Sequence, residues 1–347
     1  MQLTSFQLRF LSPAFLAGAR PKKMGSFEPW AELRSASIIG QLRWWHRFLG
    51  KQSSESRIFG SVAGESGTAA GFAIRIVNAP DSVSGATTPE SLGMDHSYFL
   101  YAQAMDNGSN YRAALAKGST FQMVLMNRRL TVADWNHLVE TATTFCWLGS
   151  LGNRSRRGFG ALFLEERNGK NCSLPEPSDL LPPHLACAIP ANCQPSRDFS
   201  TFATNAGNWL RDARRKLKDS GAPKADYFGR ISEGRATRLA SPILLRPWRT
   251  GDDYLRLLLI GRRTLVEAVA APQGKSSAPT VELEAADSDP VQTLLGEPFV
   301  YASIAAFKTQ VQKWQAEGQS ELVQRFVELT QEPKYGGLRQ QPWYPKL

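Results

Sequence analysis

Histidines are the first residues to consider for acid–base chemistry at neutral pH, and this sequence has four, at positions 46, 96, 137 and 184. His46 lies between Arg43 and Arg47 on an expected helix, so it is a candidate general base for RNA cleavage. A helix-surface histidine without a catalytic task is the preferred interpretation. The sequence also lacks HExxH, GxSxG, a Walker lysine and H-x-E with a downstream CxxC. We therefore expect no enzyme, no catalytic residue, no metal and no cofactor.

The basic residues indicate a function more specifically than the histidines do, because they occur in groups. The stretch 148-LGSLGNRSRRGFGALFL-164 places Arg154, Ser155, Arg156 and Arg157 among glycines, between an apolar helical run and a strand-like tail. A nucleotide-binding glycine loop leads from a strand into a helix, whereas this one leads from a helix into a strand. A disordered Arg/Gly tract would be longer and repetitive. We expect a short ordered basic loop, in which Phe159 either stacks on a base or packs in the core.

A second basic group lies on the expected helix 34-RSASIIGQLRWWHRFLGK-51. Its apolar residues recur with helical spacing, and Arg34, Arg43, Arg47 and Lys51 form a ridge suited to phosphate contacts. Trp44 faces away from the apolar stripe, so it is a candidate for stacking a base or contacting a partner protein as well as for core packing. Ser35 or Ser37 is expected to cap the helix, with Gly50 at its end.

A third basic group, Arg20, Lys22 and Lys23, lies in the loop between the first expected strand and this helix. These side chains should emerge near the helix N-terminus, where anions bind readily. In a ferredoxin-like sheet the first and last strands are adjacent. This loop and the loop around Arg154 should therefore converge, which would form a groove for an RNA backbone.

The whole composition agrees with a polyanionic partner. The chain has 41 basic and 31 acidic residues, which give a net charge of +10 and a pI near 9.6. Hydrophobic residues make up 42% of the chain, enough for a sizeable core. We find no secretory-type N-terminus and no apolar run long enough for a membrane span. The four cysteines lack metal-ligand spacing. We expect a cytoplasmic protein without membrane contact.

Alternating and helical patterns predict an α+β fold. In the N-terminal half they give the order strand, helix, strands, helix, strand, which is the β-α-β-β-α-β order of ferredoxin-like and RNA-recognition folds. The expected elements are strands at 2–11, 72–78, 97–105, 118–127 and 161–166, and helices at 34–51 and 131–151.

The C-terminal half repeats this logic less clearly. A helix is expected at 199–220, strands at 238–248 and 254–263, and helices near 300–316 and 319–330. The resulting division is an N-terminal domain at 1–167, an irregular connector at 168–198 and a C-terminal domain at 199–347.

Several motifs together resemble the RAMP superfamily of CRISPR proteins, and within it subunit one of the Cmr (type III-B) effector complex. They span roughly residues 1–250 and are 13-PAFLAGA-19, 33-LRSASIIGQLRWWHRFLG-50, 58-IFGS-61, 149-GSLGNRSRRGFGAL-162 and 238-RLASPILLRP-247. The resemblance implies tandem ferredoxin-like (RRM-like) domains of the RAMP type. Within its S-x-x-G-x-L-R pattern, Gly40 is expected to let another backbone approach the helix.

The same resemblance implies a non-catalytic role in antiviral defence. The subunit would hold the 3′ part of the guide RNA (crRNA), the paired target RNA, or both, beside other type III effector subunits. The RNA-binding residues implied are Arg20, Lys22, Lys23, Arg34, Ser37, Arg43, Arg47, Arg154, Ser155, Arg156, Arg157 and Phe159.

Two other functions stay open at this point. One is a metal-independent RAMP endoribonuclease that matures guide RNA with His46 as base. The other is a scaffold that mainly contacts proteins, through Trp44, Trp343 and Tyr344.

Overall fold

The computed structural model contains two compact units, residues 1–276 and residues 277–347. The described residues are 2–16, 31–63, 66–80, 114–219, 228, 230–231, 238–239, 241–270 and 311–329. Several expected features therefore lie outside the described part of the chain. They are the strand at 97–105, the basic residues Arg20, Lys22 and Lys23, and the aromatic residues Trp343 and Tyr344.

The first sheet of residues 1–276 is antiparallel, with the strand order β4-β5-β1-β6-β7. Its strands are β1 (Leu3–Phe10), β4 (Phe72–Val77), β5 (Thr120–Asn127), β6 (Leu162–Arg167) and β7 (Lys170–Asn171). Along β1, Phe6, Leu8 and Phe10 point into the core, while Ser5 and Gln7 alternate with them on the other face. Because β1 pairs with β6, the first and last strands of the expected module are neighbours, as predicted.

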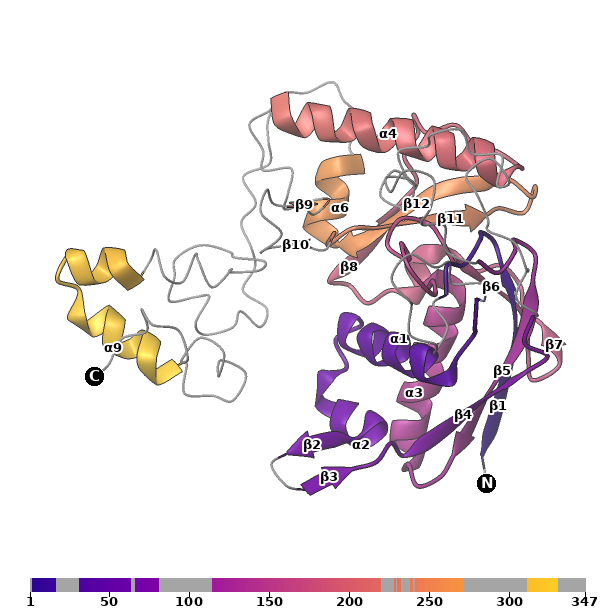
Figure 1. The fold of residues 1–347 in the computed structure, drawn as a ribbon, viewed down its shortest axis with the longest axis horizontal. Helices are drawn as coiled ribbons and strands as arrows, with labels where there is room; N and C mark the ends of the chain where they lie inside the picture. The colour runs from indigo at the N-terminus through magenta and orange to yellow at the C-terminus, as the bar shows by residue number, and fades with distance from the viewer. Residues whose placement is uncertain are drawn as a thin grey trace, which may run out of the picture. The chain divides into compact units, whose positions relative to one another are not determined.

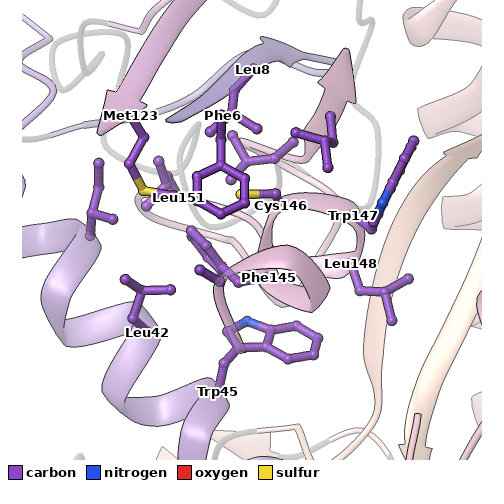
Figure 2. Packing of buried hydrophobic residues seen from close by; sticks show 14 of the residues in the cluster. Phe6, Leu8, Leu42, Trp45, Met123, Phe145, Cys146, Trp147, Leu148 and Leu151 are labelled. Atoms are coloured by element: carbon purple, nitrogen blue, oxygen red, sulfur yellow. The ribbon is translucent and has the colours of Figure 1, made fainter. Parts of the chain in front are cut away.

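Two helices, α1 (Ser35–Phe48) and α3 (Val132–Leu148), lie against one face of this sheet (Figure 1). Ile38, Leu42 and Trp45 are buried at i, i+4 and i+7 of α1. Figure 2 shows Leu42 and Trp45 beside Phe145 of α3. The Thr131 hydroxyl accepts a hydrogen bond from the Asp134 N–H at 3.1 Å and caps α3. The predicted β-α-β-β-α-β order is confirmed for this module.

The segment between α1 and β4 is more structured than expected. It contains a short 3₁₀ turn η1 (Gln52–Ser54), the helix α2 (Glu55–Phe59) and a hairpin of β2 (Ser61–Ala63) and β3 (Ser66–Thr68). The abundance of small residues there had predicted a plain loop.

A second antiparallel sheet has the strand order β11-β12-β8. It is formed by β8 (Leu185–Ala188), β11 (Leu244–Arg249) and β12 (Leu255–Arg262), with α4 (Phe199–Asp219) after β8 and α6 (Arg263–Ala270) after β12. In this order β11, β12 and β8 correspond to β4, β5 and β1 of the first sheet. The helices correspond as well, because α4 follows β8 as α1 follows β1, and α6 follows β12 as α3 follows β5. The second half therefore repeats the ferredoxin-like arrangement, which confirms the predicted α+β class with two such modules.

Residues 168–198 are more than a connector, because β8 supplies an edge strand of the second sheet and η2 (Pro177–Leu180) precedes it. The expected strand at 238–248 is divided. Its start, β10 (Arg238–Leu239), pairs with β9 (Arg230–Ile231), whereas β11 joins the second sheet.

The two modules share their hydrophobic cores. Trp248, Leu258 and Ile260 of the second sheet belong to the cluster formed by the first sheet, α1 and α3. In the opposite direction, Phe15 and Phe159 of the first module belong to the cluster under α4 and α6. Each module thus completes the core of the other.

Arg246 on β11 lies within this shared region and is only 1% exposed. Its guanidinium donates to the backbone oxygens of Leu162 at 2.7 Å and of Gly149 at 3.3 Å. Gly149 is the C-cap of α3, so the cation also offsets the negative end of that helix. Burial lowers the pKa of Arg246 to about 9, and the side chain stays charged at neutral pH.

The unit 277–347 is described at residues 311–329. A helix covers 311–316, Gly318 turns the chain with φ +70°, and α9 (Ser320–Leu329) follows. The ring centroids of Trp314 and Phe326 lie 6.4 Å apart in its small core. Across the described residues of the chain, none of the helices has the length and apolarity that crossing a membrane requires.

Candidate nucleic-acid interface

The N-terminus of α1 is built differently from the sequence-based expectation. Arg34, not a serine, is the N-cap, and its extended backbone carbonyl accepts hydrogen bonds from the N–H groups of Ser37 at 3.1 Å and Ile38 at 3.3 Å. Within the described part of the chain its side chain makes no capping hydrogen bond. The first turn, residues 35–38, consists of Ser, Ala, Ser and Ile, so no acidic side chain opposes an anion there.

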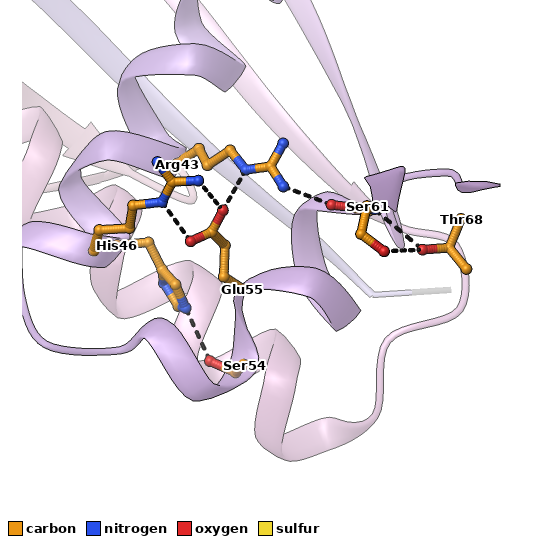
Figure 3. Close-up of polar contacts among 8 residues, drawn as sticks. Arg43, His46, Ser54, Glu55, Ser61 and Thr68 are labelled. Atoms are coloured by element: carbon orange, nitrogen blue, oxygen red, sulfur yellow. Dashed lines mark hydrogen bonds and ion pairs between the residues drawn. The ribbon is translucent and has the colours of Figure 1, made fainter. Parts of the chain in front are cut away.

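The basic ridge of α1 is partly neutralised by a single carboxylate. Glu55 of α2 accepts hydrogen bonds from the guanidinium groups of Arg47 at 2.5 Å and Arg43 at 2.6 Å (Figure 3). Arg47, and secondly Arg43, lower the pKa of Glu55 to about 2. Arg43 also donates to the Gly60 carbonyl at 2.6 Å. Two of the predicted RNA-binding cations therefore also hold α1, α2 and the start of the hairpin together.

Gly40 has no packing partner of the expected kind. No heavy atom of the described structure comes within 4 Å of a Cβ placed on it, and the residue is exposed on α1. Among the described residues no other backbone approaches the helix at Gly40, and the expected close approach stays a prediction. The open space lies beside Ala36, one turn earlier on the helix.

The loop 149–161 is ordered and closed on itself. Leu151 N–H donates to Gly160 O at 2.8 Å, and Leu162 N–H donates to Gly149 O at 3.1 Å. Gly160 has φ +66°, and a Cβ there would collide with the Leu151 backbone, so this turn requires glycine. The prediction of a short ordered loop agrees with this geometry.

The chain that leads toward the third basic group runs along this loop. Phe15 and Asn153 form an isolated antiparallel bridge, and Gly160 N–H donates to the Pro13 carbonyl at 2.8 Å. Residues 13–16 therefore lie beside the loop 149–161. The predicted convergence of the two basic loops stays a prediction, because Arg20, Lys22 and Lys23 lie outside the described residues.

Two arginines of the loop reach the second module. Arg156 donates to the Ser241 carbonyl at 2.8 Å, and Arg157 donates to the Phe228 carbonyl at 2.9 Å. Their backbone pairs with β11 as well, because Leu245 N–H donates to Arg156 O at 3.1 Å. These arginines therefore join the two modules. Arg154 and Ser155 are half-buried at the turn, where Arg154 has φ +61°.

Trp44 is engaged within the protein. Its ring stacks on Phe48 with centroids 4.8 Å apart, and the Arg156 guanidinium lies over it at 5.1 Å. Arg156 thus connects α1 to the loop and the loop to the second module. Trp44 is half-buried, and base stacking is not needed to explain its environment.

Phe159, one of the residues predicted to contact RNA, is fully buried. Its ring centroid lies 5.2 Å from that of Phe15 and 5.6 Å from that of Phe199 in the second core. The core-packing alternative is therefore correct for Phe159, and it presents no face to a base.

His46 is neither on the helix surface nor available as a base. It is fully buried, with one ring nitrogen 2.9 Å from the Thr141 hydroxyl and the other 2.9 Å from the Ser54 hydroxyl. Burial lowers the pKa of His46 to about 4. The expected helix-surface position of His46 is therefore wrong, since the helical pattern could not show that α3 and η1 would cover it.

Sequence reasoning missed Arg246 altogether. The sequence signal that could have identified it is an arginine inside the apolar run 243-ILLRPW-248. A charge on a buried strand needs hydrogen-bonding partners, so this arginine indicates a buried polar contact. Among the described residues, no group of three or more His, Cys, Asp or Glu side chains could hold a metal ion.

Comparison with known proteins adds the family. Residues 7–163 match the model of the RAMP superfamily. The first module is a RAMP domain. Its match ends in β6, and the region includes α1 and the loop 149–161, two of the motifs that carried the sequence resemblance.

The solved structures that are similar to this chain have low sequence identity to it. Cmr1 from Pyrococcus furiosus, in its apo form, is 17% identical over 80% of this chain and 92% of its own, with a TM-score of 0.48. A chain of the type III-B Cmr-beta structure bound to cognate target RNA is 11% identical over 75% and 94%, with a TM-score of 0.43. A chain of a type IV-B CRISPR complex is 13% identical over 51% and 95%, with a TM-score of 0.35. Among curated proteins, none matches this chain.

Proposed function

We propose that this RAMP protein is a non-catalytic RNA-binding subunit of a type III CRISPR effector complex. It would hold the 3′ part of the guide RNA, the paired target RNA, or both, next to other effector subunits. One observation carries the proposal. In the RAMP module, α1, the loop 149–161 and residues 13–16 meet at one place through Arg156, Trp44 and Phe15.

The chemistry of this junction suits a phosphate backbone. Arginines, serines and an acid-free helix turn bind phosphate without reading base sequence. Guide–target pairing would then supply the specificity, as in other RNA-guided systems. The net charge of +10 supports the same partner class.

The alternative of a guide-processing nuclease is weakened at His46, its candidate base. The imidazole is buried, and its two ring nitrogens are hydrogen-bonded to the Thr141 and Ser54 hydroxyls. The scaffold alternative is weakened at Trp44, which already contacts Phe48 and Arg156.

The first test is binding of the full chain to labelled single-stranded RNA over a range of salt concentrations. We expect the logarithm of the binding constant to fall linearly with the logarithm of salt, by about 0.7 per phosphate contacted. Absence of binding at about 50 mM salt, where such contacts are strong, would refute the proposed function.

Ser37 allows the site to be separated from the fold. Ser37→Glu places a carboxylate in the first turn of α1, where it should stabilise the helix by about 0.3–1 kcal/mol. Near an RNA phosphate the same charge should weaken binding by about fivefold, the effect of roughly 1 kcal/mol between nearby charges in water. Ser37→Gln is the neutral control. Equal RNA affinity of the two variants would exclude the α1 N-terminus as a contact.

A further inference from the structure

The helix α4 has one buried and one exposed side. Phe202, Ala206 and Leu210 are buried against the second sheet. Figure 1 shows α4 lying across the outside of that sheet. Because the shared core with the first module lies on the other face of the sheet, the second side of α4 faces outward.

A continuous polar stripe follows this outward side. Its residues recur at helical spacings of 3, 4, 3 and 4, and all are exposed: Thr201, Thr204, Asn208, Arg211 and Arg215. Lys216 is exposed beside it. At 1.5 Å per residue the stripe is about 21 Å long. It changes along its length from neutral hydrogen-bonding groups to cations.

The cations of α4 differ in their acidic partners from four cations of the first module. Arg9, Arg47, Lys51 and Arg57 each lie within 2.5–2.9 Å of a carboxylate. The described side chains of α4 include one acid, Asp212, which lies 3.9 Å from Arg215. Arg211 bonds a neutral group, the Asn208 side chain. Positive charge is therefore less compensated on α4 than on those four side chains.

We propose that this stripe is a second contact for the RNA phosphate backbone, separate from the α1 junction; this inference rests on the proposed function. Charge complementarity identifies the occupant. Guanidinium, ammonium, hydroxyl and amide groups are the side chains that contact phosphate and sugar. The stripe has no aromatic or methionine residue, the types enriched at the centres of protein interfaces. The change from neutral hydroxyl and amide groups to cations along the helix would let the RNA backbone follow it without base readout.

The test neutralises the stripe while keeping the helix. Arg211→Gln/Arg215→Gln/Lys216→Gln exchanges three cations for a residue of similar helix propensity. For the full chain, we expect the slope of the logarithm of the RNA-binding constant against the logarithm of salt to become shallower by about 2, if all three cations touch phosphate. The matched control is Arg128→Gln/Lys170→Gln/Arg262→Gln, which removes the same charge at exposed positions elsewhere.

Asp212→Asn tests the opposite direction. Removing the acid should tighten RNA binding about two- to fivefold, whereas loss of an exposed pair at 3.9 Å should barely change stability. If the wild-type chain binds RNA but the α4 and control triple variants behave alike, this inference fails and the proposed function stands. Failure of the wild-type chain to bind RNA overturns both. Binding of polyglutamate, and not RNA, through the three α4 cations would assign the stripe to an acidic protein and refute the RNA contact.

Discussion

Two buried polar side chains, His46 and Arg246, connect elements that are distant in sequence. His46 joins α1 to Thr141 of α3 and Ser54 of η1, and Arg246 joins β11 to both ends of the loop 149–161. Each has its polar atoms satisfied, and this is why burial is tolerated. Neither is placed to act on a substrate, so both are structural residues of the RNA-binding platform that we propose.

The buried histidine predicts a pH dependence of stability. In the folded chain the pKa of His46 is about 4, whereas an unfolded histidine has a pKa of about 6.5. The unfolded state therefore binds more protons as the pH falls from about 6.5 to about 4, and the free energy of unfolding should drop across that window by up to about 3 kcal/mol. Urea unfolding measured at several pH values checks this.

The matched variants for this prediction are His46→Gln and His137→Gln. Glutamine can bond both hydroxyls around position 46 without titrating, so His46→Gln should flatten the pH dependence. His137 is exposed on α3, and its replacement keeps the buried imidazole at position 46, so most of the pH dependence should remain. Glu55, whose pKa is lowered to about 2, loses its stabilising charge only in a lower window. An equal slope in all three proteins would contradict the role of His46.

At the scale of elements, α1 and the loop 149–161 contain glycines for opposite reasons. Gly160 is required by its left-handed φ of +66° and the adjacent Leu151 backbone. Gly40 lies in the interior of α1 with open space around it and costs helix stability. The loop is therefore a rigid connection between modules, and the exposed face of α1 keeps room for a partner.

Alanine at these two glycines should produce opposite effects. Gly40→Ala is expected to raise the free energy of unfolding by up to about 1 kcal/mol. Gly160→Ala should lower it by about 2 kcal/mol or more, because left-handed backbone strain and a backbone clash add. Chemical denaturation measures both. A stabilised Gly40→Ala variant with weakened RNA binding would identify close approach of RNA at α1, and destabilisation at Gly40 would contradict the open environment.

At the scale of the whole molecule, residues 1–276 behave as one unit although they contain two ferredoxin-like modules. Trp147 packs against Trp248 with ring centroids 6.3 Å apart, and Phe159 lies in the core of the second module. The predicted domain division at 167 would cut through both contacts.

Truncation tests this unity. A fragment of residues 1–167 loses Leu244, Trp248 and Ile260 from its core and should fail to unfold cooperatively. A fragment of residues 1–276 should show a cooperative transition close to that of the full chain. Thermal unfolding followed by circular dichroism distinguishes them. A cooperative, soluble fragment 1–167 would show that the modules are independent domains.

Much of the first module was predictable because its signals are local. The alternation of Phe6, Leu8 and Phe10 and the helical spacing of Ile38, Leu42 and Trp45 depend only on neighbouring residues. The hairpin of β2 and β3 and the short strand β8 were missed because strands of three or four residues carry little periodic signal. The site was less predictable, since a basic residue in the sequence does not reveal its partner.

By itself, the sequence determined the α+β class, the β-α-β-β-α-β order, the RAMP motifs and the positive charge, because periodicity, composition and short motifs act over neighbouring residues. Only the tertiary structure decided that Glu55 neutralises part of the α1 ridge, that Phe159 and His46 are buried, and that Arg156 and Arg157 join the modules. These outcomes depend on which distant segment packs against each side chain. The packing environment sets the free energy of a charged or aromatic side chain through desolvation and hydrogen bonding.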